Sequence, residues 1–437
     1  MAELIDMALT RSSVTSRRLP HVLFLNAQDA LGADIAVHLM LARTLDRRQV
    51  RVSAATSLRE APGVSARKTF ESIADLTLLT LDLGQPIGRH HGLARALPVL
   101  HNLRGMLSLV GLARWCRKHD VDVIHVTERP RQALFGLLVA QLAGCACIIH
   151  AHTNYYARDA SRFSNWRLHR ADAVVGVSDF VARTFQQLGK LPANRVFGLH
   201  NAVDGDLFRP NVATAGRSAM RRRLGLPEDA IVIGCVARLM AWKGQDTLLD
   251  SFAIVRKRFP TAHLVLAGTS AEPAPDGHGD YSDYLRRRIA ALNLDGAVTL
   301  PGFLPQTDMP QFYGAMDVVA HPSVEEPFGL AVVEAMASER PVIAVNRGGI
   351  PEIIRDGQDG LLVPAEQSVI MAEAITRVLQ QPTFASQLAR AGRQRVLKTF
   401  TPEIQAQRMF EIYQTVLARR QRLGLPRPDL KHAQSTS

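Results

Sequence analysis

Residues 317–345 read DVVAHPSVEEPFGLAVVEAMASERPVIAV, and this stretch decides the fold. Two short runs rich in β-branched residues, 317–323 and 341–345, flank an apolar segment that is typical of a buried helix. A strand, a helix and a second strand in this order predict one unit of a parallel α/β sheet. Glu334 stands in the middle of the apolar segment, which raises the question of what its carboxylate binds.

The same pattern recurs along the chain in two series. The polar segment 210–229 ends in a Gly/Pro turn and separates them. We therefore predict an α/β protein with two Rossmann-like, doubly wound parallel-sheet domains, which face a ligand across a cleft with the carboxyl ends of their strands. The expected strands are 21–27, 50–55, 77–83, 121–126, 146–151, 173–178 and 195–200 in the first series, and 230–237, 263–268, 297–302, 317–323, 341–345 and 360–364 in the second.

The length of the chain also favours two domains, because 437 residues exceed what one hydrophobic core usually organises. Thr401 and Pro402 form a good N-cap and first-turn pair for a last helix. The expected segments are an N-terminal extension at 1–19, a first domain at 20–210, a second domain at 211–400, a helix at 401–421 and a disordered tail at 422–437.

Charge is distributed unevenly over a chain whose net charge is +12. Residues 1–210 hold 26 Lys and Arg against 17 Asp and Glu, whereas residues 211–437 hold 26 against 23. The first half is therefore attracted to anions, such as nucleic acid, an anionic membrane surface or a phosphorylated substrate. An arginine-rich composition is the alternative explanation. No helix-turn-helix, zinc-finger or RNA-binding aromatic motif is visible, so we expect no nucleic-acid partner.

The N-terminal stretch mixes acids and arginines, so it does not resemble an export signal, and we expect a cytoplasmic protein. The most apolar window, 134–149, is shorter than the ~20 residues of a membrane-spanning helix and fits a helix followed by a buried strand. The four cysteines have no zinc-site spacing and are expected to be reduced core residues: Cys116, Cys145, Cys147 and Cys235.

The spacing of the glutamates suggests a long ligand. Pro327 is expected at the first helical position, which puts Glu326 at the mouth of the helix and Glu334 about two turns inside. At ~1.5 Å per residue they lie roughly 12 Å apart along the axis, so they hold two parts of one ligand rather than one atom. A nucleotide sugar has that shape. Glu325 is expected to be a solvated neighbour, and the alternative is that Glu326 caps the helix while Glu334 meets an arginine.

Cations and glycines follow other strands of the second series. Arg238 and Lys243, in GCVARLMAWKG (234–244), come just after a core strand, where two cations can meet a diphosphate. Gly348 and Gly349, in NRGGIPE (346–352), allow the backbone to approach a phosphate closely. Cations, glycines and carboxylates thus converge at the strand ends of one domain.

At these residues the chain resembles a known family. The segments that carry the resemblance are HNAVDGDLFRP (200–210), VARLMAWKGQDTLL (236–249), SVEEPFGLAVVEAMASERPVIAVNRGGIPEIIRDGQDGLLVP (323–364) and FTPEIQAQRMFEIYQTVL (400–417). They are similar to the retaining glycosyltransferases of family 4, or group 1, which have the two-domain GT-B fold. In that fold the C-terminal helix crosses back to the first domain.

The resemblance implies roles for residues of the second domain. Glu326 would contact hydroxyls of the donor sugar near the reacting carbon, and Glu334 the nucleotide ribose. Arg238 and Lys243 would bind the diphosphate and stabilise the charge on the leaving nucleotide, so we expect no cofactor, no obligatory metal and no metal ligands. Backbone of Phe328, Gly329 and Leu330 would bind the sugar and phosphate, and the segment Gly302, Phe303 and Leu304 would hold the base.

In the first domain, the resemblance places Gly32 at a phosphate-facing turn, although Leu31 stands where the family usually has another glycine. His152, in HAHTNYY (150–156), would lie beside the donor sugar. The implied catalytic group is therefore Glu326, His152, Arg238 and Lys243. The acceptor would attack on the face from which the nucleotide departs, with the leaving phosphate taking its proton and no protein nucleophile.

The predicted function is a retaining, metal-independent hexosyltransferase that moves a sugar from a nucleotide-diphosphate donor to a glycan or lipid-linked acceptor. Its expected setting is the synthesis of polysaccharide, glycolipid or another cell-surface glycan. The basic first domain motivates a further hypothesis of peripheral contact with the anionic cytoplasmic membrane face. The alternatives are a nucleotide-sugar epimerase or sugar phosphorylase on the same fold, a non-catalytic nucleotide-sugar-binding protein, and a metal-dependent hydrolase built on His150 and His152, whose rings share one side of a strand.

Overall fold

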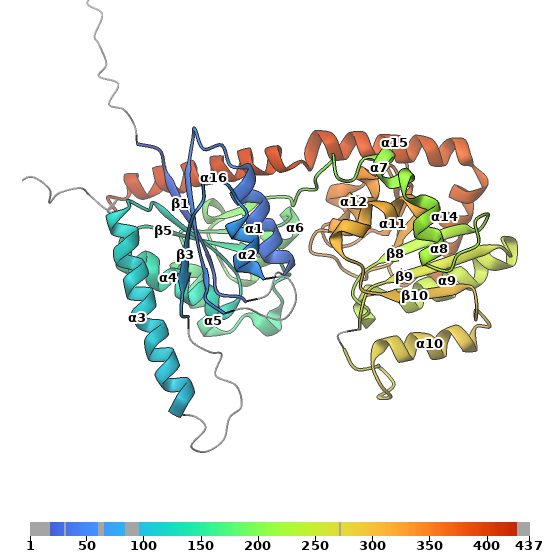
Figure 1. Ribbon diagram of the computed structural model, residues 1–437, viewed down its shortest axis with the longest axis horizontal. Helices are drawn as coiled ribbons and strands as arrows, with labels where there is room; N and C mark the ends of the chain where they lie inside the picture. Colours follow the sequence, from blue (N-terminus) through green and yellow to red (C-terminus); the bar gives the residue numbers. More distant parts are fainter. Residues whose placement is uncertain (1–17, 30–31, 60–64, 84–95, 271, 426–437) are drawn as a thin grey trace, which may run out of the picture.

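The computed structural model describes residues 18–29, 32–59, 65–83, 96–270 and 272–425. Within these ranges the chain forms two α/β lobes that lie side by side (Figure 1). Each lobe is built on one parallel sheet, as the alternation of strands and helices predicts. The expected N-terminal extension (1–19) and C-terminal tail (422–437) lie mostly outside the described residues.

The first sheet has seven parallel strands in the order β3-β2-β1-β4-β5-β6-β7. Its order reverses between β1 and β4, the topology of a doubly wound sheet. β1 and β5 are buried along their whole length, because helices cover both faces of the sheet. The strands are β1 (His21–Asn26), β2 (Arg51–Ser57), β3 (Thr77–Leu81), β4 (Val123–Thr127), β5 (Ala146–Ala151), β6 (Ala173–Gly176) and β7 (Val196–Gly198).

The second sheet has six parallel strands in the order β10-β9-β8-β11-β12-β13, with its reversal between β8 and β11. All six predicted strands of this half, like all seven of the first, are present with ends shifted by no more than a few residues. The strands are β8 (Ile231–Val236), β9 (Ala262–Ala267), β10 (Val298–Gly302), β11 (Val318–His321), β12 (Val342–Val345) and β13 (Leu361–Val363). The predicted fold class is therefore confirmed.

The helices connect the strands and cover the sheets (Figure 1). In the first half they are α1 (Ala33–Thr44), α2 (Ala66–Glu71), α3 (Ala96–Lys118), α4 (Pro130–Ala143), α5 (Arg162–Arg170) and α6 (Asp179–Leu188). In the second half they are α7 (Pro210–Ala215), α8 (Arg217–Arg223), α9 (Gln245–Arg258), α10 (Tyr281–Ala291), α11 (Met309–Ala315), α12 (Leu330–Ala337), α13 (Ile350–Ile353), α14 (Ser368–Gln380), α15 (Pro382–Thr399) and α16 (Pro402–Arg422).

Helix α16 follows the second sheet in sequence but packs on the first lobe, where it lies against α1 and β5 (Figure 1). The Thr401 side chain caps its start by accepting a hydrogen bond from the backbone N–H of Ile404. Met409 and Tyr413 belong to the same hydrophobic core as Phe24 of β1. At its far end Arg420 forms an ion pair with Asp172 at 2.9 Å. The last helix thus ties the C-terminal part of the chain to the first sheet.

The apolar window 134–149 is divided between α4 and β5, as predicted. No helix in the described ranges combines the length and the apolar character that crossing a membrane requires. All four cysteines are free and buried, as expected for core residues. Burial also raises the pKa of the Cys235 thiol to about 12, which keeps it protonated and unreactive.

The packing of α16 predicts a measurable loss of stability. Met409 is fully buried, so Met409→Ala leaves a cavity in the core of the first lobe. Changes of this kind cost about 2–5 kcal/mol. We expect a clear fall in the midpoint of urea unfolding, whereas Arg408→Ala, on the exposed side of the same helix, serves as the control. Equal midpoints for the two variants would show that α16 does not stabilise the first lobe.

Candidate functional site

The carboxylate of Glu326 lies at the carboxyl ends of β8 and β11, the strands between which the order of the second sheet reverses. One oxygen of Glu326 accepts hydrogen bonds from Lys243 Nζ at 2.6 Å and from His321 Nε2 at 3.1 Å. Lys243 ends the short 3-10 helix after β8, and its ammonium lies 4.0 Å from the centre of the Trp242 ring. The fold therefore brings together two predicted site residues, Glu326 and Lys243. It also places His321 and Trp242, which were not predicted, in contact with them.

This cluster keeps Glu326 ionised. Burial by itself raises the pKa of the Glu326 carboxyl. The Lys243 ammonium and the His321 ring lower this pKa by more than burial raises it, so the net value is about 2. The carboxylate is therefore a charged hydrogen-bond acceptor at neutral pH. A charged acceptor next to a held cation can bind sugar hydroxyls while the cation faces a phosphate.

The loop before α12 is not helical, and here the sequence prediction is wrong. The helix begins at Leu330, not at Pro327, because Gly329 has the left-handed φ of 117° and the Pro327 carbonyl accepts a hydrogen bond from the Ser178 hydroxyl of the first lobe at 2.6 Å. Glu326 is therefore held by a loop, and Glu334 lies about one turn inside the helix. The predicted separation of two helical turns does not apply, although the two carboxylates still have different surroundings.

Gly348 and Gly349 give this loop its shape. The backbone N–H of Gly349 donates to the carbonyl of Glu326 at 2.8 Å. A Cβ atom at Gly348 would lie 2.1 Å from that same carbonyl oxygen, and the φ of Gly348 is 66°. The two glycines thus pack directly on the backbone of the Glu326 loop, which is a different role from the phosphate contact that the sequence suggested.

Glu334 belongs to a second cluster. Its two oxygens accept hydrogen bonds from the Tyr313 hydroxyl at 2.8 Å and from the Gln306 amide at 2.9 Å. Burial raises the pKa of this carboxyl, and the two hydrogen bonds offset only part of that effect. Gln306 follows the segment 302–304, so this predicted base-binding segment and Glu334 are connected through one side chain. Its Phe303 side chain is 73% exposed, which leaves a large apolar face free to stack on a ring.

The remaining predicted residues of the second lobe lie on the two loops that carry Lys243 and Glu326 or at the start of α12. Arg238 is exposed in the turn after β8, five residues before Lys243. Phe328 is buried and contacts the rings of His200 and Phe400, so only its backbone can face a ligand. Gly329 is the N-cap of α12 and Leu330 its first residue, which places their N–H groups at a helix N-terminus.

Loops of the first lobe cross to the Glu326 loop. The carboxylate of Glu325 accepts hydrogen bonds from the Asn154 amide at 2.7 Å and from the Tyr156 hydroxyl at 3.0 Å. Glu325 is therefore not a solvated neighbour, as the sequence suggested, but a bridge between the lobes. His152 and Glu326 each lie within two residues of this bridge, so the structure brings the loops of both predicted site residues together.

A second bridge lies beside the first. Glu352, which follows the Gly348 turn, accepts hydrogen bonds from the backbone N–H groups of Asp179 and Phe180 at 2.8 and 2.6 Å. It also accepts one from His200 Nε2 at 2.8 Å. A carboxylate at the N-terminus of α6 is favourable because the helix dipole is positive there. Sequence reasoning missed Glu352, Ser178 and Asn154, since a contact between lobes leaves no local pattern.

In the first lobe, Gly32 is the N-cap of α1, and a Cβ atom there would lie 2.6 Å from a carboxylate oxygen of Asp34. His152 follows β5 and is half-buried beside His150, with ring centres 4.4 Å apart. Burial lowers the pKa of His152 well below its usual range, and the neighbouring His150 and His38 lower it further. The ring is therefore neutral at neutral pH.

A cavity of about 430 Å³ opens beside the loop that holds His152. Burial raises the pKa of Glu128, on its wall, to about 7. The polar side chains that line it include Glu128, Thr153, Asn154, Arg158, Ser161 and Arg167. A larger cavity of about 590 Å³ lies between the start of β1 and α16, away from every predicted site residue.

The fold is that of a two-domain α/β protein, and loops that carry predicted site residues meet where the two lobes contact each other. Comparison with known families agrees with that class. The family model for group 1 glycosyl transferases matches residues 216–395, and the model for glycosyltransferase family 4 matches residues 36–207. The two matches together span most of the chain, so each lobe is similar to one half of a glycosyltransferase of this kind.

Individual relatives show the same class. A D-inositol 3-phosphate glycosyltransferase of Nocardioides sp. is 32% identical over 255 residues, which span 57% of this chain and 54% of the relative. This chain thus spans about half the length of that curated relative. An alpha-D-kanosaminyltransferase of Streptomyces kanamyceticus is 26% identical over 337 residues, 70% of this chain and 84% of the relative.

A solved structure shows the shared fold. HepE of Anabaena, in complex with UDP and glucose, superposes with a TM-score of 0.72 at 22% identity, over 90% of this chain and 99% of its own. This likeness supports the GT-B arrangement of the two lobes.

The Glu326 cluster predicts a pH-dependent stability. A folded pKa near 2, against about 4.5 for an exposed glutamate, corresponds to about 3 kcal/mol. Because the folded pKa is the lower one, this contribution is complete above about pH 4.5 and is lost as the pH falls toward 2. We expect wild type to be more stable than Glu326→Gln at pH 7 in urea unfolding, with a difference that narrows between pH 5 and pH 3.

Glu325→Gln is the matched control, because an amide oxygen can still accept the hydrogen bonds of Asn154 and Tyr156. Its difference from wild type should be small at every pH. A Glu326→Gln difference that stays constant or grows on acidification would contradict the assigned ion pair.

Proposed function

We propose that this protein is a retaining glycosyltransferase that moves a sugar from a nucleotide-diphosphate donor to a hydroxyl group of a glycan or lipid-linked acceptor. The observation that carries the proposal is the Glu325 bridge, which sets the loop of His152 beside the loop of Glu326. A donor bound between these two loops would thereby contact both lobes.

The donor would lie along the second lobe. Glu326 would accept hydrogen bonds from the sugar hydroxyls, and Lys243 with Arg238 would bind the diphosphate. The backbone at residues 328–330 would add N–H groups to the phosphate, as helix N-termini do. Glu334 and the exposed Phe303 would hold the ribose and the base. Gly32, at the N-cap of α1, would approach the donor from the first lobe.

The chemistry would need charge stabilisation more than a protein nucleophile. As the bond from sugar to phosphate breaks, negative charge grows on the leaving nucleotide, and Lys243 and Arg238 would stabilise it in place of a divalent cation. The neutral His152 ring would orient a sugar hydroxyl. The acceptor hydroxyl would attack from the face that the phosphate leaves, and the phosphate would take its proton, so the anomeric configuration is retained.

The acceptor would occupy the cavity beside His152. Its wall carries Arg158 and Arg167 as donors and Glu128 as an acceptor, which suits a polyhydroxylated or phosphorylated acceptor. The D-inositol 3-phosphate glycosyltransferase among the relatives has a name consistent with an acceptor of this kind.

Turnover with labelled nucleotide sugars tests this proposal. We expect Lys243→Ala to lower turnover by 10²- to 10³-fold, because a group that stabilises the developing charge is lost. Lys257→Ala, an exposed lysine on α9 of the same lobe, is the control and should retain activity. Full turnover in folded Lys243→Ala and Glu326→Ala variants would refute the assigned roles.

The position of the label separates the alternatives. Label in a larger product indicates transfer, label in a changed nucleotide sugar indicates an epimerase, and label in a sugar phosphate indicates a phosphorylase. Binding of the donor without any conversion would indicate a non-catalytic protein.

Helix α5 is the candidate surface for a membrane-linked acceptor. Phe163 and Trp166 are 54% and 44% exposed, and the guanidinium groups of Arg167 and Arg170 lie over their rings. Aromatic rings beside arginines suit the interface of an anionic bilayer. This helix forms part of the wall of the proposed acceptor cavity, so a lipid-linked acceptor could reach the cavity from the membrane.

We expect the protein to sediment with vesicles that contain phosphatidylglycerol, and to be released as salt rises. The double variant Phe163→Ala/Trp166→Ala should bind several-fold more weakly, because it loses the aromatic anchors. Leu397→Ala, an exposed apolar residue of α15, is the matched control. Absence of vesicle binding by wild type at low salt would rule out this surface.

A further inference from the structure

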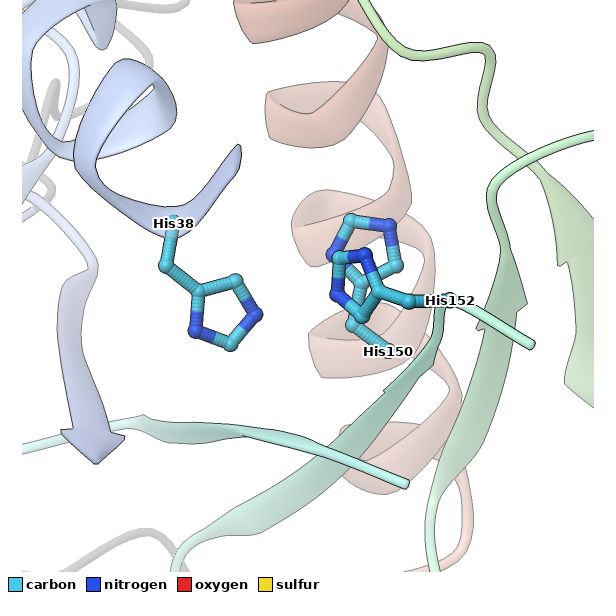
Figure 2. A group of neighbouring side chains, drawn as sticks. All are labelled: His38, His150 and His152. Atoms are coloured by element: carbon cyan, nitrogen blue, oxygen red, sulfur yellow. The ribbon is translucent and has the colours of Figure 1, made fainter. Parts of the chain in front are cut away.

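Three histidine rings of the first lobe converge at one point. His38 lies on α1, His150 is the last residue but one of β5, and His152 directly follows that strand. Figure 2 shows the His38 ring directed from α1 toward the pair from β5, with α16 behind them. One ring nitrogen from each lies within 4.8 Å of the others. Nitrogens that share one ion at ~2.1 Å lie at most ~4.2 Å apart, so small shifts of the rings would let a single metal ion bind all three.

Several nitrogen atoms of these rings have no hydrogen-bond partner among the described residues. His38 and His150 are fully buried. Within the part of the chain that the structure describes, neither nitrogen of His38 has a hydrogen-bond partner, and neither does Nε2 of His150 or of His152. A buried polar group without a partner costs about 1–3 kcal/mol. Four such nitrogens in one place indicate that a ligand belongs there.

Packing alone does not require histidine at these positions. The His38 ring contacts the rings of Phe24 and His125 at centre distances of 5.3 and 4.7 Å. A leucine or phenylalanine could fill that space without bringing two unpaired nitrogens into the core.

A relay behind the cluster supports a metal ligand. His150 Nδ1 lies 3.3 Å from His125 Nε2, and His125 Nδ1 lies 2.6 Å from the hydroxyl oxygen of Tyr413. If each Nδ1–H donates along this chain, the lone pair of His150 Nε2 points into the cluster. Metal-binding histidines commonly donate their other ring N–H to such an outer partner, which fixes the tautomer.

The donor set selects the class of metal. Three imidazoles without a thiolate suit Zn²⁺ and related divalent transition metals, with a further position open to another ligand. Asp34 lies one turn before His38 and is buried with one unpartnered oxygen, while its other oxygen forms an ion pair with Arg129 at 2.8 Å. The other grouping of this kind, Asp179, His200 and Glu352, is explained by the hydrogen bonds that Glu352 already accepts.

We propose that His38, His150 and His152 form a binding site for one divalent transition-metal ion of the zinc class. The ion would join α1 to β5 beneath α16. The ion would bind the Nε2 atom of His152. It would not neutralise the donor diphosphate, because the diphosphate would lie against Lys243 and Arg238 of the other lobe. The site shares His152 with the proposed transfer site, and the ion would hold that ring in place without itself taking part in the transfer.

Cobalt binding tests the site independently of any transfer activity. The full chain is treated with a chelator, desalted and titrated with Co²⁺ while the visible spectrum is recorded. We expect one equivalent to bind with the intense visible absorption of a low-coordinate nitrogen site, and one equivalent of Zn²⁺ to abolish that absorption. A titration without a saturable visible band would refute the proposal.

Variants assign the band to these residues. His152→Ala, at a half-buried position that should tolerate it, and His38→Leu should each weaken Co²⁺ binding by at least 100-fold. His125→Phe should weaken it by about 10- to 100-fold, as loss of an outer partner does. His278→Ala, an exposed histidine of the second lobe, should bind as wild type does. Unchanged binding in His152→Ala and His38→Leu would place the metal elsewhere and refute the site.

Discussion

The ion pair between Lys243 and Glu326 is the interaction on which the site depends. A buried carboxylate is costly unless a cation and further hydrogen bonds compensate it, and here Lys243 and His321 do so on one oxygen. The pair joins the turn after β8 to the loop after β11, so it fixes the two strand ends between which the sheet order reverses. Gly348 packs its backbone directly against that of Glu326, and no side chain would fit between the two.

From this loop the contacts extend to the first lobe. Glu325 and the Pro327 carbonyl, on either side of Glu326, each receive hydrogen bonds from first-lobe side chains. Glu326, which pairs with Lys243, thus lies between two residues that contact the other lobe, Glu325 and Pro327. A movement of one lobe relative to the other would therefore reach the Glu326 carboxylate within one residue. The position of the Glu326 loop is thus coupled to the relative position of the two lobes.

The strands could be predicted from the sequence because each is a short β-branched run bounded by polar or turn residues, a local signal. The start of α12 could not, since the left-handed Gly329 and the contact of Pro327 with Ser178 override the preference of proline for a first helical turn. Lys243 and Glu326 were predicted as site residues from their positions after strands and from the resemblance, but that they form an ion pair with each other depends on the strand order. His38 gave no signal at all, because one histidine on a helix has the same pattern as any half-polar core position.

In the proposed function, a nucleotide-diphosphate donor lies across the second lobe with Lys243 and Glu326 at its reacting end. A crystal structure of the protein with a donor whose sugar-phosphate bond is not hydrolysed tests it most directly. We expect the diphosphate within hydrogen-bond distance of Lys243 Nζ, the sugar hydroxyls on the Glu326 carboxylate and the base beside Phe303. A donor bound elsewhere, or one whose diphosphate contacts neither Lys243 nor Arg238, would contradict it.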